Sequence, residues 1–196
     1  MIYVRYEMPM KEILYFESIG EVNTDETLKI SKKRAEELGI NDLVVASTRG
    51  NTAVKVLEAF KGFNIAVVPH VTGLRKPGMQ ELTAENREKI EKLGGKIVIA
   101  AHTFGGVDAA ISSKWNTMYP SGIIAQTLRM FGEGMKVVVE IAAMAADAGA
   151  IPEDRDVLAI AGTGKGADTA VVIKPANSRR LFDISIKEII AKPSSP

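Results

Sequence analysis

The stretch that decides the fold reads Leu43-Val44-Val45-Ala46-Ser47-Thr48-Arg49-Gly50-Asn51-Thr52-Ala53. Its first four residues are apolar without polar alternation, which is typical of a strand that is buried on both faces of a sheet. The run then breaks into small polar residues, and Thr52–Phe60 carries apolar residues at helical spacing. This order of strand, loop and helix predicts a unit of a parallel α/β sheet.

The same alternation continues on both sides of that unit. We expect strands over Lys11–Phe16, Asp42–Ala46, Asn64–Val68, Lys96–Ala101, Asp156–Ala161, Thr169–Lys174 and Ile186–Ala191. We expect a helix that Asn23 caps and Gly39 ends, and a second helix over Thr83–Leu93. Two more helices are expected between Ser121 and Ala148, with a break near Gly132. Residues 102–120 show no clear pattern. The predicted fold is a three-layer α/β/α domain with a mainly parallel sheet and an antiparallel addition late in the chain.

The composition limits the classes of protein that are expected. The 196 residues suit one domain, which we place at 11–192 after a flexible N-terminal extension at 1–10. The formal charge is +1 with 6% aromatic residues, so we expect no nucleic-acid partner. No run approaches the ~18 apolar residues of a membrane span, and residues 1–11 lack the apolar core and small-residue cleavage site of a signal peptide. We therefore expect a cytoplasmic protein without a membrane partner. Cysteine is absent and there are two histidines, so we expect no metal site.

The loop after the central strand has the composition of a phosphate site. It combines exposed backbone N–H groups, hydroxyl groups and one cation at the start of a helix, all of which favour an anion. The candidate ligands are Ser47, Thr48, Arg49, Gly50, Asn51 and Thr52. Two alternatives stay open: Ser47 or Asn51 caps the helix, and Arg49 is a solvated loop residue.

A second loop near the C-terminal end has a similar composition. It reads Ile160-Ala161-Gly162-Thr163-Gly164-Lys165-Gly166-Ala167-Asp168-Thr169-Ala170. A strand-like run follows it, so it is not a dinucleotide-binding fingerprint, which requires a helix there. The candidate ligands are Gly162, Thr163, Gly164, Lys165, Gly166 and Asp168, and an ordinary glycine hairpin is the alternative.

Several other residues are candidates with open alternatives. His70, followed by Thr72 and Gly73, and His102 each come after a predicted strand, where each is a possible acid, base or ligand contact or a plain loop residue. Glu140 and Asp147 suggest either polar work at a site or structural hydrogen bonds to loop backbone, and we favour the structural interpretation. The only tryptophan, Trp115, is interpreted as a stacking, core or dimer residue. The segment Met135–Ala148 is apolar on nearly every face, so we expect it to be buried, partly against a second copy in a homodimer.

Both loops resemble those of the C-terminal α/β domain of pyruvate kinase. In regulated pyruvate kinases the corresponding loops hold the phosphates of a sugar bisphosphate effector. A closer resemblance is to stand-alone archaeal proteins of this length, and it covers nearly the whole chain after residue 10. It is carried by Asn23-Thr24, Glu140, Met144-Ala145-Ala146-Asp147-Ala148-Gly149, Gly166-Ala167-Asp168-Thr169-Ala170 and Pro175-Ala176.

The resemblance implies that the chain binds a phosphorylated small molecule, with flavin mononucleotide (FMN) as the cofactor. The alternatives are a flavin-dependent enzyme of unknown substrate and a regulatory or assembly module that binds a sugar phosphate. The 196 residues hold no counterpart of the barrel domain of pyruvate kinase, so we expect no pyruvate kinase activity. No catalytic residue is assigned.

Overall fold

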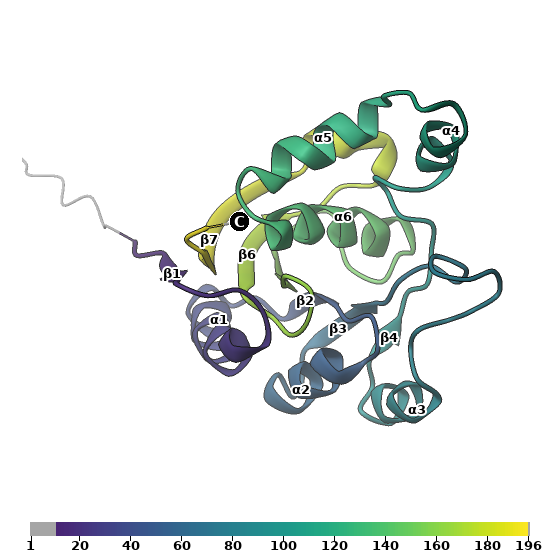
Figure 1. Cartoon of the computed structure of the whole chain (residues 1–196). Helices are drawn as coiled ribbons and strands as arrows, with labels where there is room; N and C mark the ends of the chain where they lie inside the picture. Colours follow the sequence, from purple (N-terminus) through teal and green to yellow (C-terminus); the bar gives the residue numbers. More distant parts are fainter. Residues whose placement is uncertain (1–10, 196) are drawn as a thin grey trace, which may run out of the picture.

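The computed structural model describes residues 11–195, and it places helices on both faces of one seven-stranded sheet (Figure 1). The expected extension at residues 1–10 lies outside the described residues. The strands are β1 (Leu14–Phe16), β2 (Asp42–Ala46), β3 (Asn64–Val68), β4 (Lys96–Ile97), β5 (Val157–Ala161), β6 (Thr169–Lys174) and β7 (Ser185–Pro193). The helices are α1 (Thr24–Leu38), α2 (Asn51–Ala59), α3 (Ala84–Lys92), α4 (Val107–Trp115), α5 (Pro120–Arg129) and α6 (Glu133–Asp147), with 3-10 helices η1 (Glu21–Asn23) and η2 (Ser178–Asp183).

The strands run in the order β1-β7-β6-β5-β2-β3-β4. Among the described residues β6 is the one strand that runs antiparallel to its neighbours, β5 and β7, and the other pairings are parallel. The predicted mainly parallel sheet with a late antiparallel addition is therefore confirmed. The reversal at β6 follows from the short loop after β5, because only antiparallel strands can be joined by a hairpin.

The core lies on both faces of the sheet, since successive side chains of a strand point to opposite sides. Val44 and Ala159 pack on the face that α6 covers, whereas Val45 and Ile160 pack on the face covered by α1, α2 and α3. All four are completely buried. This explains why the central strands have no polar alternation in the sequence.

Helix α6 is buried inside the single chain, as its apolar sequence predicts. Its inner side packs on the sheet and α5 lies along its outer side (Figure 1), where η2 also contacts it. The apolar circumference of α6 is thus covered without a second copy of the chain. The expected homodimer consequently draws no support from this helix.

Two local expectations were wrong. Asn23 does not cap α1, because its backbone is already helical (φ −90°, ψ −6°) and its side chain donates to the carbonyl of Ser18 (2.6 Å). The strand expected over Lys96–Ala101 ends at Ile97, and the last ladder bond to β3 runs from the N–H of Val98 to the carbonyl of Val67 (2.8 Å). Beyond that bond the chain leaves the sheet.

The sheet topology creates a crevice at the carboxyl ends of β2 and β5. These strands are parallel neighbours, with Val45 opposite Ile160. The chain leaves β2 through α2 toward β3 on one side, and it leaves β5 toward β6 on the other side. Ligands bind at such points of divergence in open α/β sheets. Among residues 11–195 no helix is long and apolar enough to cross a membrane.

Candidate functional site

The loop between β2 and α2 is held in place from two directions. The N–H of Ser47 donates to the carbonyl of Val68 (3.1 Å), and the hydroxyl of Ser47 accepts from the N–H of Ala53 (3.1 Å). The side chain of Asn86, on α3, donates to the carbonyl of Arg49 (2.9 Å) and to the side-chain oxygen of Asn51 (2.6 Å). Of the two candidate capping residues, Ser47 and Asn51, it is Ser47 whose side chain accepts a hydrogen bond from an N–H of α2.

Gly50 lets this loop pass close to α3. Its φ of +97° lies in the left-handed region that favours glycine. A Cβ atom at this position would lie 2.5 Å from the Cβ of Asn86 and 2.8 Å from Cδ1 of Leu82. No residue with a side chain fits there without displacing its neighbours.

The loop presents a row of backbone N–H groups without a protein acceptor. Within the part of the chain that the structure describes, the N–H groups of residues 48–52 donate to no other residue. The first N–H groups of a helix lack intrahelical partners and carry partial positive charge. The start of α2 is therefore a place where an anion satisfies several donors at once.

The second loop joins β5 to β6 and is fixed from below by Asp168. This carboxylate is completely buried and accepts from the N–H of Gly20 (2.8 Å), the N–H of Thr163 (3.1 Å) and the hydroxyl of Thr169 (2.8 Å). Gly166 has a φ of +74°, and a Cβ there would lie 2.5 Å from Cα of Glu21. Asp168 thus anchors the loop, while Lys165 is exposed on it.

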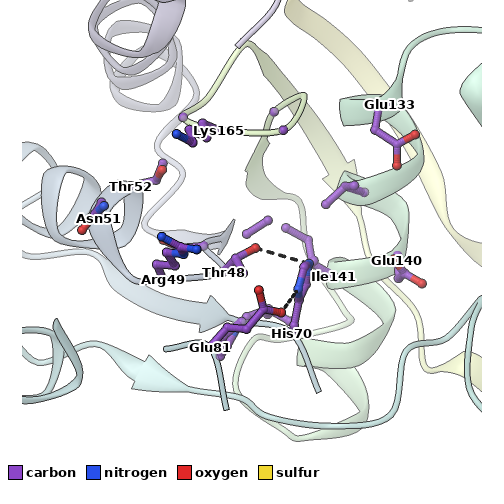
Figure 2. Close-up of a pocket in the computed structure, with 18 of the residues that line it drawn as sticks. Thr48, Arg49, Asn51, Thr52, His70, Glu81, Glu133, Glu140, Ile141 and Lys165 are labelled. Atoms are coloured by element: carbon purple, nitrogen blue, oxygen red, sulfur yellow. Dashed lines mark hydrogen bonds and ion pairs between the residues drawn. The ribbon is translucent and has the colours of Figure 1, made fainter. Parts of the chain in front are cut away.

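Together the two loops line a cleft of about 590 Å3 at the β2–β5 crevice (Figure 2). Eleven of the sequence-predicted site residues line it: Ser47, Thr48, Arg49, Asn51, Thr52, His70, His102, Gly162, Gly164, Lys165 and Gly166. The other predicted residues, Gly50, Thr72, Gly73, Thr163 and Asp168, do not belong to its lining. The structure thus brings the two loops and both histidines into one space.

The cleft also contains residues that sequence reasoning did not assign to it. Helix α6 contributes Glu133, Lys136, Val137, Ile141 and Met144 beside Glu140, and other segments contribute Glu21, Arg75 and Glu81. The α6 residues recur at helical spacing, so they share one face of the helix. The sequence signal that could have placed this helix face at the cleft was the charged pair Lys136 and Glu140, one turn apart in an otherwise apolar helix.

The charges of the cleft are arranged unevenly. Arg49, Arg75 and Lys165 make no ion pair with any carboxylate within residues 11–195. Two of the lining carboxylates are paired with a cation, Glu140 with Lys136 and Glu133 with Arg129 (2.6 Å). Glu81 is hydrogen-bonded to His70 (2.7 Å), and Glu21 makes no ion pair among the described residues. Three unpaired cations thus stand against the carboxylates of Glu21 and Glu81.

His70 connects the first loop to a carboxylate. Its Nδ1 lies 2.7 Å from Oε2 of Glu81, and its Nε2 lies 3.3 Å from the hydroxyl of Thr48 (Figure 2). A carboxylate accepts only, so we assign the proton of the ring to Nδ1 and leave Nε2 to accept from Thr48. This gives a chain of carboxylate, imidazole and hydroxyl that ends at the row of N–H groups.

His102 lies beside His70, with 5.6 Å between the ring centroids. Its Nε2 accepts from the N–H of Val71 (3.2 Å). Burial lowers the pKa of His102, against an opposing effect of the nearby Glu140 carboxylate. The neutral ring is consistent with the acceptor role of its Nε2.

The remaining candidates have structural or peripheral positions. Glu140 accepts from the N–H of Phe104 (3.1 Å) and Asp147 accepts from the N–H of Ser178 (2.9 Å), so both make the favoured structural hydrogen bonds, and Glu140 in addition lines the cleft. Trp115 is 63% exposed on α4 and lies outside the cleft, which excludes the core interpretation. Among the described residues no group of three or more His, Asp or Glu is placed to hold a metal ion.

The comparison with known families agrees with this architecture. The family described as pyruvate kinase, alpha/beta domain, matches residues 25–173. The match begins in α1, includes both loops and α6, and ends within β6. It covers more than half of the chain, and the chain therefore belongs to the pyruvate kinase α/β domain family.

Proposed function

We propose that this chain binds a phosphorylated small molecule, with the phosphate on residues 47–52. The observation that carries the proposal is the row of unpaired N–H groups at residues 48–52. A phosphate supplies several acceptor oxygens at one place, and hydrogen bonds to a charged acceptor are stronger than those to a neutral one. The hydroxyl group of Thr52 adds a donor at the same lining.

The charges of the cleft support an anionic ligand. Arg49 lies in the loop and Lys165 lies on the opposite wall at Gly162–Gly166 (Figure 2). Arg49 offers paired hydrogen bonds to a phosphate, whereas Lys165 offers a point charge. With Arg75 they give three cations without a carboxylate partner among the described residues.

FMN is the ligand that we propose for this cleft, as the resemblance implies. The residues fit it in two respects. The loops offer donors and cations for a phosphate, and Val137, Ile141 and Met144 of α6 offer an apolar wall for a planar ring. The volume of about 590 Å3 lies within the ~300–1,000 Å3 of typical ligand pockets. When bound, FMN would supply hydride or one-electron transfer chemistry.

A flavin-dependent enzyme is a second candidate, and the pair of imidazoles favours it. His70 and His102 line the cleft with their ring centroids 5.6 Å apart. Either side chain is a suitable proton donor or acceptor beside a reacting ring. The third candidate is a regulatory or assembly module for a sugar phosphate, which needs only the phosphate contacts.

The test compares ligands that differ in one group. Quenching of flavin fluorescence is followed as the protein is titrated into FMN and into riboflavin, which has the same ring without the phosphate. We expect tight binding of FMN and much weaker binding of riboflavin. A sugar bisphosphate should compete with FMN, because it would occupy the same phosphate contacts. Arg49→Ala should weaken FMN binding, while Lys61→Ala, an exposed cation beyond the far end of α2, is the matched control. Equal affinity for FMN and riboflavin would refute the phosphate site.

A further inference from the structure

The chain of Glu81, His70 and Thr48 has the geometry of an activated nucleophile. A hydroxyl becomes nucleophilic when a base accepts its proton and a third group orients that base. Here Nε2 of His70 is 3.3 Å from the Thr48 hydroxyl, and Glu81 holds Nδ1 at 2.7 Å. Glu81 is well shielded, with a side chain 14% exposed, so the orientation of the ring is firmly set.

The place of Thr48 in the fold fits the same role. It lies on the turn between a buried strand and a helix, where a hydroxyl is presented at the edge of the sheet. The neighbouring N–H groups of residues 49–52 have no protein acceptor among the described residues. They are the kind of preorganised donors that stabilise negative charge as it develops during a reaction.

We propose that Thr48 accepts the phosphoryl group of a phosphate monoester and that the chain hydrolyses such esters. This inference rests on the proposed phosphate site, and it adds a reaction at that site. His70 is the general base and acid, and Glu81 is a positioning residue that acts through His70. Phosphoryl transfer is the reaction class because the cations around Thr48 match the charge on the oxygens of a transferring phosphoryl group.

The reaction balances with water as the only other reactant. In the first step the Thr48 oxygen forms a bond to phosphorus, its proton passes to Nε2 of His70, and the bond from phosphorus to the alcohol oxygen breaks. The departing alcohol oxygen lies in line with the attack and away from His70, so it takes a proton from solvent water, while His70 keeps the proton of Thr48. In the second step water attacks the phosphorus of phosphothreonine from the side that the alcohol left and loses a proton to solvent, and the Thr48 oxygen leaves with the proton held on Nε2 of His70. The products are the alcohol and inorganic phosphate.

The experiment uses p-nitrophenyl phosphate as the probe and follows two readouts. One is release of p-nitrophenolate, and the other is transfer of a phosphoryl group to the peptide that contains Thr48, detected by mass spectrometry after acid quench. We expect turnover by the wild-type chain and by Thr48→Ser, and none by Thr48→Val. His70→Gln should lower turnover by about 10²–10⁴-fold, the usual worth of a general base. Glu81→Gln should lower kcat with little change in KM.

Controls separate this inference from the proposed function. Thr127→Val removes a hydroxyl on α5 that donates to the carbonyl of Ile123, and it should turn over like the wild type. Binding of FMN is measured on each variant. Binding of FMN without turnover or phosphothreonine would overturn the inference and leave the proposed function intact. Turnover that survives in Thr48→Val would show that Thr48 is not the nucleophile and would overturn the inference. Failure of the wild-type chain to bind FMN would overturn the FMN proposal alone, because formation of phosphothreonine at Thr48 needs only the phosphate site.

Discussion

Replacement of Gly50 by alanine tests whether the first loop has the shape described above. Two costs are expected at this position. The left-handed conformation, φ +97°, costs about 1–2 kcal/mol for a residue with a side chain. The new Cβ would lie 2.5 Å from the Cβ of Asn86, and overpacking of this kind costs about 1–3 kcal/mol. The free energy of unfolding should therefore fall by about 2–5 kcal/mol.

Gly62→Ala is the matched control for this prediction. Gly62 has a similar φ of +89°, but a Cβ there would meet nothing within 4 Å. It should show only the conformational cost of about 1–2 kcal/mol. Urea unfolding followed by circular dichroism gives both values, and an unchanged slope with urea shows that the compactness of the unfolded state is unaffected.

The difference between the two variants isolates the contact between the loop and α3, because both share the conformational cost and only Gly50→Ala adds the steric one. Relief of this contact displaces residues 49–51, so FMN binding should weaken in Gly50→Ala and stay unchanged in Gly62→Ala. Equal losses of stability in the two variants, with FMN binding retained in both, would refute the close packing of Gly50 against Asn86.

Three further predictions concern charge and assembly. Arg49→Ala should weaken FMN binding by about 1.5–3 kcal/mol. Lys165→Ala should weaken it by less, and this smaller loss should shrink more as salt is added. Calorimetric titration at two salt concentrations checks both values, and equal negligible losses would contradict the prediction. The hydrogen bond from Arg34 lowers the pKa of Glu188 from 4.5 to about 2, so its stabilisation is present above pH 4.5 and is lost as the pH falls toward 2; acid unfolding of Glu188→Gln should lack that part of the pH dependence. We predict a homodimer through the exposed apolar surface around Trp115, and light scattering that gives the 21.1 kDa mass of one chain would reject it.

The sequence predicted the fold best where strands are covered on both faces. The run Leu43–Ala46 is too short for a buried helix, and it lacks the polar alternation of a strand with one face in water, so a fully covered strand was the consistent prediction. Prediction failed over residues 102–120 because α4 has no buried residue, so no hydrophobic period marks it. It also failed at Ile99–Ala101, where apolar composition suggested a strand although the chain leaves the sheet after Val98.

The site was predictable only in part, because composition does not give direction. The polar residues of the two loops were identified, since their types suit a phosphate. Asp168 was assigned as a ligand on the same grounds, yet its side chain is completely buried beneath the loop that it anchors. Glu81 was missed because it follows His70 by eleven positions across a loop, and only the folded chain brings the two side chains to 2.7 Å.

The two walls of the cleft differ in how they are supported, and this difference bears on how a ligand would bind. The first wall is the start of α2, and its N–H groups are fixed by the helix and by the bonds of Asn86 to the loop. The second wall is a hairpin between β5 and β6, anchored by Asp168 but with Lys165 exposed at its tip. A rigid set of donors loses little conformational entropy when an anion binds, whereas an exposed lysine must be ordered. Affinity should therefore come mainly from the first wall, and the second wall should govern how strongly binding depends on salt.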